Sequence, residues 1–302
     1  MKIAICGGTG LIGKALTQKL LTLNHEVILF SRGKKTPKEF INSTNVKLVT
    51  TSVPKTNELK GLDVLINLAG ESVVGSRWSE EVKNKLRTSR VDYTNELLKN
   101  LSQCKNKPEL YLQASAIGYY GFEPDGSKQF TEDSPNGSDF LAKLCYDWEK
   151  EAEFANTIVS RLAIIRIGVV ISSEGGAIEK MLPPFKAFVG GPIGSGEQFM
   201  SWIHIDDLTN AIVTIINNKD WNGVFNLTSP NPLSNSEFSK VLAKVLNRPS
   251  FVRTPEFAIE LLFGEGAQVI TKGQNVFPKR LKENTFSFQF ETLEIALNDI
   301  LN

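Results

Sequence analysis

The sequence has few of the residues that build disulfide frameworks and metal centres. Its 302 residues include three cysteines, Cys6, Cys104 and Cys145, and two histidines, His25 and His204. The cysteines are odd in number, far apart and without C-x-x-C spacing, so they support neither a disulfide scaffold nor a zinc site. Two histidines so widely separated form no metal-binding motif. We therefore expect a reducing compartment and no bound metal.

An excess of one charge and a long apolar run are also missing. Lys and Arg total 34 and Asp and Glu total 33, which leaves a net charge of +1. Proteins that bind nucleic acids or anionic membranes usually show a strong positive excess. The longest apolar run, residues 162–171, is interrupted by Arg166, and the run at residues 1–6 is too short for a signal peptide. We expect no nucleic-acid partner, no membrane span and a cytoplasmic location.

The apolar residues that are present form short runs separated by helix-like stretches. The runs cover residues 2–6, 27–30, 46–49, 64–68, 110–114 and 164–171. This alternation is typical of a doubly wound parallel sheet with helices on both faces, so we predict an α/β fold. We divide the chain into a nucleotide-binding domain at 1–172, with later returns near 200–230, and a smaller C-terminal α/β cap at 173–302. The cap includes a helical segment at 250–302.

Capping residues and helical periodicity place the helices. Ser79, followed by two glutamates, predicts the N-cap of a long helix that runs to about Cys104. Paired glycines and prolines between residues 175 and 196 predict loops with only short regular elements. Asp206 is the predicted N-cap of a later helix. Further helices are predicted at 140–154, 206–217, 234–246 and 255–263.

A glycine-rich turn lies directly between the first predicted strand and the first predicted helix. Residues 7–13 read Gly-Gly-Thr-Gly-Leu-Ile-Gly, with Gly7, Gly10 and Gly13 in G-x-x-G-x-x-G spacing. Such glycines let the backbone bend sharply and approach a pyrophosphate, while the helix N-terminus offers free N–H groups. The alternative is a tight turn that binds nothing. The context favours a dinucleotide site on a Rossmann-type sheet.

The end of the second strand indicates which dinucleotide is bound. An NAD site usually has Asp or Glu here, which accepts hydrogen bonds from the adenine ribose. This chain has Ser31 and Arg32, followed by Lys34 and Lys35. Cationic side chains suit a 2′-phosphate, so we predict NADP(H) rather than NAD(H). The alternative is a solvated basic loop.

Further motifs make the chain resemble a known family. The epimerase-like branch of the extended and atypical short-chain dehydrogenase/reductases is similar in the glycine turn and in residues 67–71, 89–91, 115–121, 166–170, 181–185, 190–196, 202–207 and 277–280. The resemblance implies a Rossmann-type domain that binds NADP(H). The cofactor-binding positions that it implies are Thr9, Leu11 and Ile12 in the turn, Leu68, Ala69 and Gly70 after the fourth strand, Lys85 and Arg90 on the long helix, and Val170.

The catalytic pattern of that superfamily is incomplete in this chain. It usually combines Ser or Thr with Tyr-x-x-x-Lys, in which the lysine lowers the pKa of the tyrosine that moves the proton. Ser115 fits the serine, although a strand-end hydroxyl bonded to backbone is the alternative. The positions expected for the tyrosine and the lysine hold Phe140 and Leu144, and neither can move a proton.

Other tyrosines remain as candidates. Tyr146 and Lys150 form a literal Tyr-x-x-x-Lys six residues late, which turns them about 120° off the original helix face. The alternative is a solvent-facing pair on an amphipathic helix. Tyr119 or Tyr120 is the other candidate for a phenolic acid, and a structural role for both stays open. We interpret His204 as a hydrogen-bonded structural residue.

Two functions stay open at this stage. The first is an NADP(H)-dependent oxidoreductase or epimerase that acts on a small polar or sugar-like substrate, with Ser115 and a tyrosine as proton handlers and residues 181–198 as a lid. The second is a non-catalytic NADP(H)-binding sensor or regulatory protein that has lost Tyr-x-x-x-Lys. A homodimer is left open in both cases.

Overall fold

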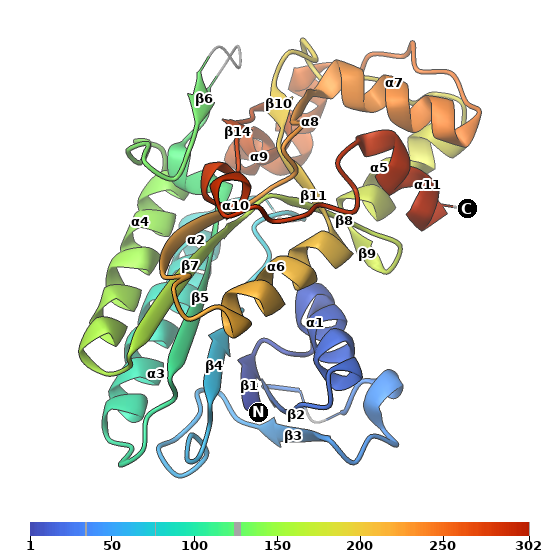
Figure 1. Ribbon diagram of the computed structural model, residues 1–302. Helices are drawn as coiled ribbons and strands as arrows, with labels where there is room; N and C mark the ends of the chain where they lie inside the picture. Colours follow the sequence, from blue (N-terminus) through green and yellow to red (C-terminus); the bar gives the residue numbers. More distant parts are fainter. Residues whose placement is uncertain (34, 76, 124–127, 302) are drawn as a thin grey trace.

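The protein is built around one parallel sheet (Figure 1). The computed structural model describes residues 1–33, 35–75, 77–123 and 128–301. Seven strands lie in the order β12-β7-β5-β4-β1-β2-β3, and each neighbouring pair is parallel. The bounds are β1 Lys2–Cys6, β2 Glu26–Ser31, β3 Val46–Thr50, β4 Val64–Asn67, β5 Leu110–Ala116, β7 Arg161–Ile167 and β12 Gly223–Leu227. The doubly wound α/β fold predicted from the sequence is confirmed.

The strand order shows where a ligand of this fold binds. The chain winds outward from β1 through β2 to β3, then crosses to β4 and continues through β5 and β7 to β12 on the other side. The order reverses between β1 and β4. In open α/β sheets, ligands lie in the crevice outside the carboxyl ends of the strands at this switch point.

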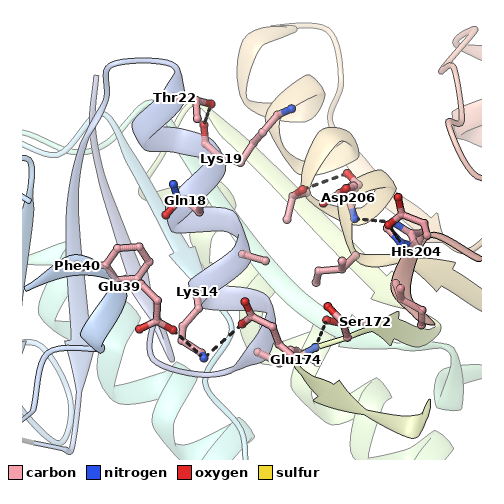
Figure 2. Close-up of a pocket in the computed structure, with 17 residues that line it drawn as sticks. Lys14, Gln18, Lys19, Thr22, Glu39, Phe40, Ser172, Glu174, His204 and Asp206 are labelled. Carbon is pink, nitrogen blue, oxygen red and sulfur yellow. Dashed lines mark hydrogen bonds and ion pairs between the residues drawn. The ribbon is translucent and has the colours of Figure 1, made fainter. Parts of the chain in front are cut away.

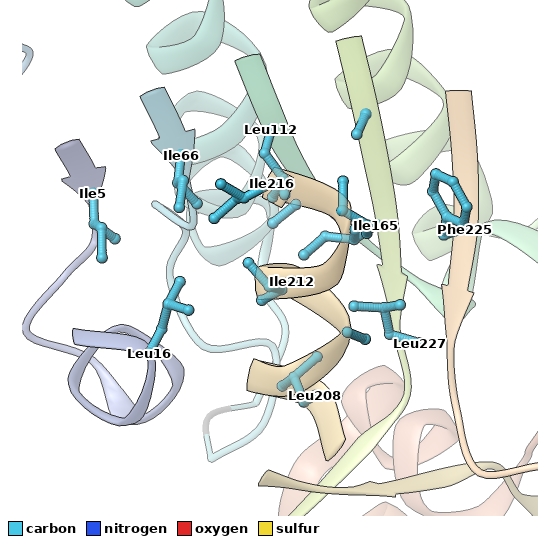
Figure 3. Close-up of a cluster of buried hydrophobic side chains, with 14 of the residues drawn as sticks. Ile5, Leu16, Ile66, Leu112, Ile165, Leu208, Ile212, Ile216, Phe225 and Leu227 are labelled. Atoms are coloured by element: carbon cyan, nitrogen blue, oxygen red, sulfur yellow. The ribbon is translucent and has the colours of Figure 1, made fainter. Parts of the chain in front are cut away.

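Helices α1 (Leu11–Thr22) and α6 (Ile205–Asn217) cover one face of the sheet. Figure 3 shows Leu16 of α1 and Ile212 of α6 pointing toward side chains of the central strands. Residues alternate between the two faces of a strand, so every second apolar side chain enters this layer. Burial of each Leu or Ile contributes about 1.5–3 kcal/mol. Members of the cluster include Ile5, Ile66, Leu112, Ile165, Leu208, Ile216, Phe225 and Leu227.

The opposite face carries the long helix predicted to start at Ser79. The Ser79 side chain accepts a hydrogen bond from Val82 N, as an N-cap does. The helix runs as α2 (Glu80–Arg87), a π-helical turn η2 (Thr88–Asp92) and α3 (Tyr93–Ser102). Helix α4 (Phe140–Ala152) packs beside it. Buried Leu65, Tyr111 and Ile164 of the strands face this layer.

The remaining elements form the cap and the short connections. A three-stranded sheet in the order β11-β8-β9 links the cap to the main sheet, and β13 pairs with β10 while β14 pairs with β6. None of the helices in the described part of the chain combines the length and apolarity needed to cross a bilayer. The bounds are β6 Gln129–Phe130, β8 Val169–Ser172, β9 Gly175–Gly176, α5 Ala177–Lys186, β10 Phe199–Met200, β11 Trp202–His204, β13 Leu233–Ser234, α7 Asn235–Leu246, α8 Glu256–Phe263, α9 Gln268–Thr271, β14 Asn275–Val276, α10 Lys279–Glu283 and α11 Leu293–Leu301, with short helical turns η1 Lys38–Phe40, η3 Ile117–Tyr120, η4 Glu153–Thr157 and η5 Gly264–Ala267.

Three local predictions were wrong. The run at 164–171 is two strands, because the chain leaves the main sheet at Gly168, where a Cβ would lie 2.6 Å from Ser201 O. Residues 177–186, expected as loops with only short regular elements, form the 10-residue helix α5 despite two internal prolines, since Ile178 and Phe185 are buried in the cap. The N-cap of α6 is His204 rather than Asp206, because the imidazole Nδ1 accepts the Asp206 N–H.

Candidate functional site

The glycine turn joins β1 to α1 at the switch point, and its glycines differ in what requires them. Gly7 has φ +75°, and a Cβ there would lie 2.8 Å from Leu68 O. A Cβ on Gly13 would lie 2.6 Å from Gly8 Cα. Packing of the protein on itself therefore demands glycine at both positions.

Gly10 is different, because none of the described residues crowds it. Its φ is −77°, which any residue adopts, and a Cβ there would meet, in the described part of the chain, only Gly7 O, at an ordinary 3.4 Å. Gly10 is also exposed. The space that a side chain would fill is open to a ligand that approaches the backbone, as a pyrophosphate does in this kind of turn. The residues present thus fit a dinucleotide phosphate.

The N-terminus of α1 beside Gly10 is free to receive an anion. Among the described residues no side chain caps this end, and its first turn carries no acid. The partial positive charge of a helix N-terminus is thus uncompensated. Leu11 and Ile12 form the first turn, and Thr9 Oγ1 lies 3.1 Å from Ser31 Oγ at the end of β2. The turn and the end of β2 therefore border one site.

Arg32 projects from the end of β2 toward the loop that follows β4. Its side chain is 73% exposed, and Nη2 lies 2.6 Å from Glu71 Oε1. Ser31 Oγ accepts the Gly33 N–H, which shapes the turn. Lys35 is exposed, whereas the predicted Lys34 lies outside the described residues. Arg32 and Ser31 thus lie together, with Glu71 as the anion that Arg32 contacts.

The segment after β4 lies over the carboxyl end of the sheet. Leu68 and Ala69 are partly buried and Gly70 is exposed. Leu68 N donates to Cys6 O at 2.9 Å, and Ala69 N donates to Asn67 Oδ1 at 3.2 Å. These bonds hold the segment against the glycine turn.

The two predicted cations of the long helix lie in different surroundings. Arg90 Nη2 donates to Glu71 O at 2.8 Å, and Nη1 donates to Leu86 O at 3.2 Å. The guanidinium therefore connects the loop after β4 to the long helix. Burial lowers the pKa of Arg90. Lys85 is 64% exposed and paired with Glu81 on its own helix. Arg90 therefore positions the loop, and Lys85 projects into solvent.

A row of polar side chains crosses the carboxyl ends of three neighbouring strands. Ser115 of β5 is in register with Arg166 of β7, and Arg166 is in register with Asn226 of β12. All three are buried and lie on the face covered by α4. A buried polar row at this edge is unusual for a structural core and is typical of a functional site.

Glu149 of α4 accepts hydrogen bonds from two members of this row. Its Oε1 accepts from Ser115 Oγ at 2.6 Å and from Arg166 Nε at 2.9 Å, while Oε2 accepts from Arg166 Nη2 at 2.8 Å. Burial lowers the pKa of Arg166, but the hydrogen bonds and charge of Glu149 outweigh it and raise the pKa. The guanidinium is therefore permanently charged. Sequence reasoning missed Glu149, because no motif marks it.

The two adjacent tyrosines have different positions. Tyr120 is buried; its Oη donates to Asn226 Oδ1 at 2.7 Å and accepts from Arg166 Nη1 at 2.9 Å. Burial raises its pKa to about 12. Tyr119 is partly exposed, and its ring stacks on Arg166 with the guanidinium carbon 3.4 Å from the ring centroid. Burial raises the pKa of Tyr119 as well.

Helix α4 presents no tyrosine or lysine to Ser115. The residues of α4 that lie near β5 and the turn after it are Leu141 and Cys145, beside Gly118, and Glu149, which accepts from Ser115. The expected positions Phe140 and Leu144 precede Leu141 and Cys145 by one residue each. Phe140 packs edge-on against Trp78 at 5.2 Å, and Leu144 is buried in the hydrophobic core.

The late pair on the same helix is exposed. Tyr146 is 44% exposed, and Lys150 is 62% exposed and paired with Glu153. Val170, the last predicted cofactor contact, lies in β8 and is partly buried. Its carbonyl oxygen lies 3.3 Å from where a Cβ of Gly176 would stand, so the β8–β9 turn is tight here.

A separate groove of about 410 Å³ lies behind α1, between α1, η1, the β8–β9 turn and the start of α6 (Figure 2). Lys14 crosses it, with Glu39 Oε1 at 3.1 Å and Glu174 Oε2 at 3.5 Å. Of the predicted cofactor residues, Leu11 lines it. The groove is therefore distinct from the phosphate turn.

His204, Asp206 and Asp299 gather at this groove with ligand atoms within 4.8 Å of one another. Because Nδ1 of His204 accepts the Asp206 N–H, Nε2 carries the proton of the neutral ring. Nε2 lies 3.3 Å from Asp299 Oδ2 without hydrogen-bond geometry. Burial lowers the pKa of His204. A protonated Nε2 has no lone pair for a metal, so this group does not suit one.

Comparison with known proteins gives the family. Residues 3–228 match the model of the NAD dependent epimerase/dehydratase family, and residues 254–300 match a domain of unknown function (DUF1731). The chain is 39% identical to the epimerase family protein SDR39U1 homolog, chloroplastic, of Arabidopsis thaliana, over 100% of this chain and 87% of that protein. It is 37% identical to the epimerase family protein YfhF of Bacillus subtilis, over 100% and 98%.

A solved structure extends the likeness to three dimensions. The human epimerase family protein SDR39U1, determined with NADPH, superposes with a TM-score of 0.87 at 33% identity and covers 99% of both chains. The epimerase-like resemblance drawn from the motifs is thereby confirmed. With a model that spans most of the sequence and relatives matched along nearly their whole length, the chain belongs to the NAD dependent epimerase/dehydratase family.

Proposed function

We propose that this protein binds NADP(H) and is an oxidoreductase or epimerase that acts on a small polar or sugar-like substrate. The observation that carries the proposal is Gly10, a glycine that the fold itself does not need, beside an uncapped helix N-terminus and within the same site as Arg32. The human relative determined with NADPH supports the choice of cofactor.

Different residues of the chain would bind different parts of the cofactor. Gly10 and the first turn of α1 would receive the pyrophosphate, while Ser31 and Arg32 would receive the 2′-phosphate. Leu68, Ala69 and Gly70 would line the cofactor after β4. A bound nicotinamide supplies hydride chemistry. The substrate would lie between it and residues 181–198, above the row of Ser115, Arg166 and Asn226.

A second candidate is an NADP(H)-binding sensor without turnover. It is favoured by helix α4, which presents Cys145 and Glu149 to Ser115 instead of a tyrosine and a lysine. The two candidates share the cofactor site and differ in hydride transfer. Consumption of NADPH with some carbonyl substrate supports the enzyme, whereas tight binding without consumption across a broad panel supports the sensor.

The test of the shared part is calorimetric titration with NADPH and NADH of the wild type and of Gly10→Ala. Because a Cβ fits at Gly10 within the protein, we expect Gly10→Ala to melt within a few degrees of the wild type and yet to lose NADPH binding about tenfold or more. Equal NADPH affinity in both proteins, or no binding by the wild type, refutes the proposed phosphate site.

A further inference from the structure

The candidate hydroxyl groups at the polar row differ in where they donate their hydrogens. The hydrogen of Ser115 is directed to Glu149, and the hydrogen of Tyr120 is directed to Asn226. Tyr120 Oη also accepts from Arg166, so it has no remaining hydrogen to donate. In the described part of the chain, Tyr119 donates its hydroxyl hydrogen to no acceptor. Of the three candidate proton handlers, Tyr119 is therefore the one with a hydrogen to give.

The surroundings of Tyr119 hold its ring in place. The guanidinium carbon of Arg166 lies over it, 3.4 Å from the ring centroid, and Glu149 fixes that guanidinium with two hydrogen bonds. A two-point ion pair leaves the guanidinium little rotational freedom. Ser115 in turn fixes one oxygen of Glu149. The chain Ser115–Glu149–Arg166 thus ends on the ring of Tyr119.

We propose that Tyr119 is the proton donor in the reduction of a carbonyl substrate, and that Ser115, Glu149 and Arg166 are positioning residues for it. The inference rests on the proposed oxidoreductase function and deepens it. The carbonyl carbon accepts a hydride from a reduced nicotinamide, which is oxidised. The carbonyl oxygen takes the C=O electron pair and the proton of Tyr119. The tyrosinate regains a proton from solvent at its exposed edge.

The charged groups around Tyr119 favour a donor over a base. Burial raises the pKa of Tyr119, Arg166 of β7 lowers it, and Glu149 and Tyr146 of α4 raise it further, so the net direction is upward. Tyr120, its neighbour in η3, is protonated too. A site whose phenols keep their protons at neutral pH suits reduction of a carbonyl better than oxidation of an alcohol.

The experiment measures NADPH consumption with 9,10-phenanthrenequinone as the carbonyl probe and NADPH binding by calorimetry. We expect Tyr119→Phe to lower kcat about 100-fold or more, since a general acid contributes 10²–10⁴-fold, with the Kd for NADPH nearly unchanged. The control Asp147→Asn, which changes an exposed side chain of the adjoining helix α4, should keep wild-type turnover.

Outcomes separate this inference from the proposed function. Full turnover by Tyr119→Phe, or NADPH binding by the wild type without consumption of the probe, overturns the donor assignment and leaves the cofactor proposal standing. Absence of NADPH binding by the wild type overturns the proposed function itself.

The positioning role has a readout that needs no turnover. Ring-labelled tyrosine followed by ¹³C NMR, with the Tyr119 signal assigned through Tyr119→Phe, gives the titration midpoint of that phenol. Glu149→Gln removes a charge that raises the pKa of Tyr119, so the midpoint should fall, and Glu149→Asp should return it toward the wild-type value. If Glu149→Gln does not fold, Ser115→Ala serves instead, and it should lower kcat more than it changes KM. An unmoved midpoint, or in Ser115→Ala an unchanged kcat, contradicts the positioning role.

Discussion

Replacement of Arg32 by alanine should weaken NADPH binding strongly and leave NADH binding nearly unchanged. The side chain of Arg32 is 73% exposed and touches Glu71, which is 43% exposed, across 2.6 Å. An exposed pair of this kind contributes about 1 kcal/mol or less to stability, so loss of Arg32 should not unfold the protein. Its effect therefore falls on the ligand that carries a 2′-phosphate.

The expected magnitude follows from the chemistry of the contact. Charge-assisted hydrogen bonds contribute about 1.5–3 kcal/mol, which corresponds to a roughly 10- to 150-fold increase in the Kd for NADPH. Glu71→Gln should act in the opposite direction, because the carboxylate competes with the phosphate for Arg32. That gain is limited to the strength of an exposed pair, at most about fivefold.

Calorimetry with NADPH and NADH in parallel, at low and at high salt, measures both effects. Lys35→Ala is the matched control, since Lys35 is an exposed cation three residues further along. The salt dependence of NADPH binding should decrease in Arg32→Ala, because one phosphate contact is gone. Equal weakening of NADPH and NADH, or an effect of Lys35→Ala as large as that of Arg32→Ala, would show that Arg32 does not read the 2′-phosphate.

Three further predictions concern stability and reactivity. Burial lowers the pKa of His204 in the folded state, so below about pH 6.5 the unfolded chain binds more protons than the folded one. The free energy of unfolding should therefore fall from pH 7 toward pH 5. In urea denaturation, a His204→Asn variant in a His25→Asn background should show a smaller fall than the His25→Asn protein. Removal of the charge of Arg166 with methionine should cost about 3–5 kcal/mol of unfolding free energy, since it leaves Glu149 buried without its partner, and a loss below about 1 kcal/mol would contradict the buried ion pair. The three buried thiols, two of which have a pKa raised to about 12 by burial, should resist iodoacetamide in native buffer and react in guanidinium, as mass spectrometry would show.

The parts of the site that sequence predicts are those encoded locally. The turn at Gly7–Gly13 is specified by adjacent residues, since a strand, a bend and a helix follow each other without a gap. The same holds for the N-cap at Ser79. Arg32 could be placed at the end of a strand for the same reason, although its contact with Glu71, 39 residues away, could not.

The row of polar side chains could not be predicted from a single sequence, because it depends on the register of the strands. Ser115, Arg166 and Asn226 are separated by 51 and 60 positions and meet only because three strands align. Glu149 joins them through the rotation of α4, and an error of one residue selects Phe140 and Leu144 instead of Leu141 and Cys145. The helix at 177–186 was missed for a related reason, since burial of Ile178 and Phe185 in the cap outweighs the unfavourable prolines.

The buried row also bears on how the sheet assembles correctly. Strands β5 and β7 are buried on both faces and rich in aliphatic residues, so a slip of two positions would keep apolar side chains in both layers at little cost. Such a slip would move Arg166 away from Glu149 and leave a buried charge without its partner. The polar row therefore distinguishes the native alignment of β5, β7 and β12 from neighbouring ones. Loss of Arg166 or Glu149 should consequently lower the yield of correctly folded chain. A comparison of the refolding yields of the wild type and of the variant that lacks the charge separates this effect from any effect on chemistry.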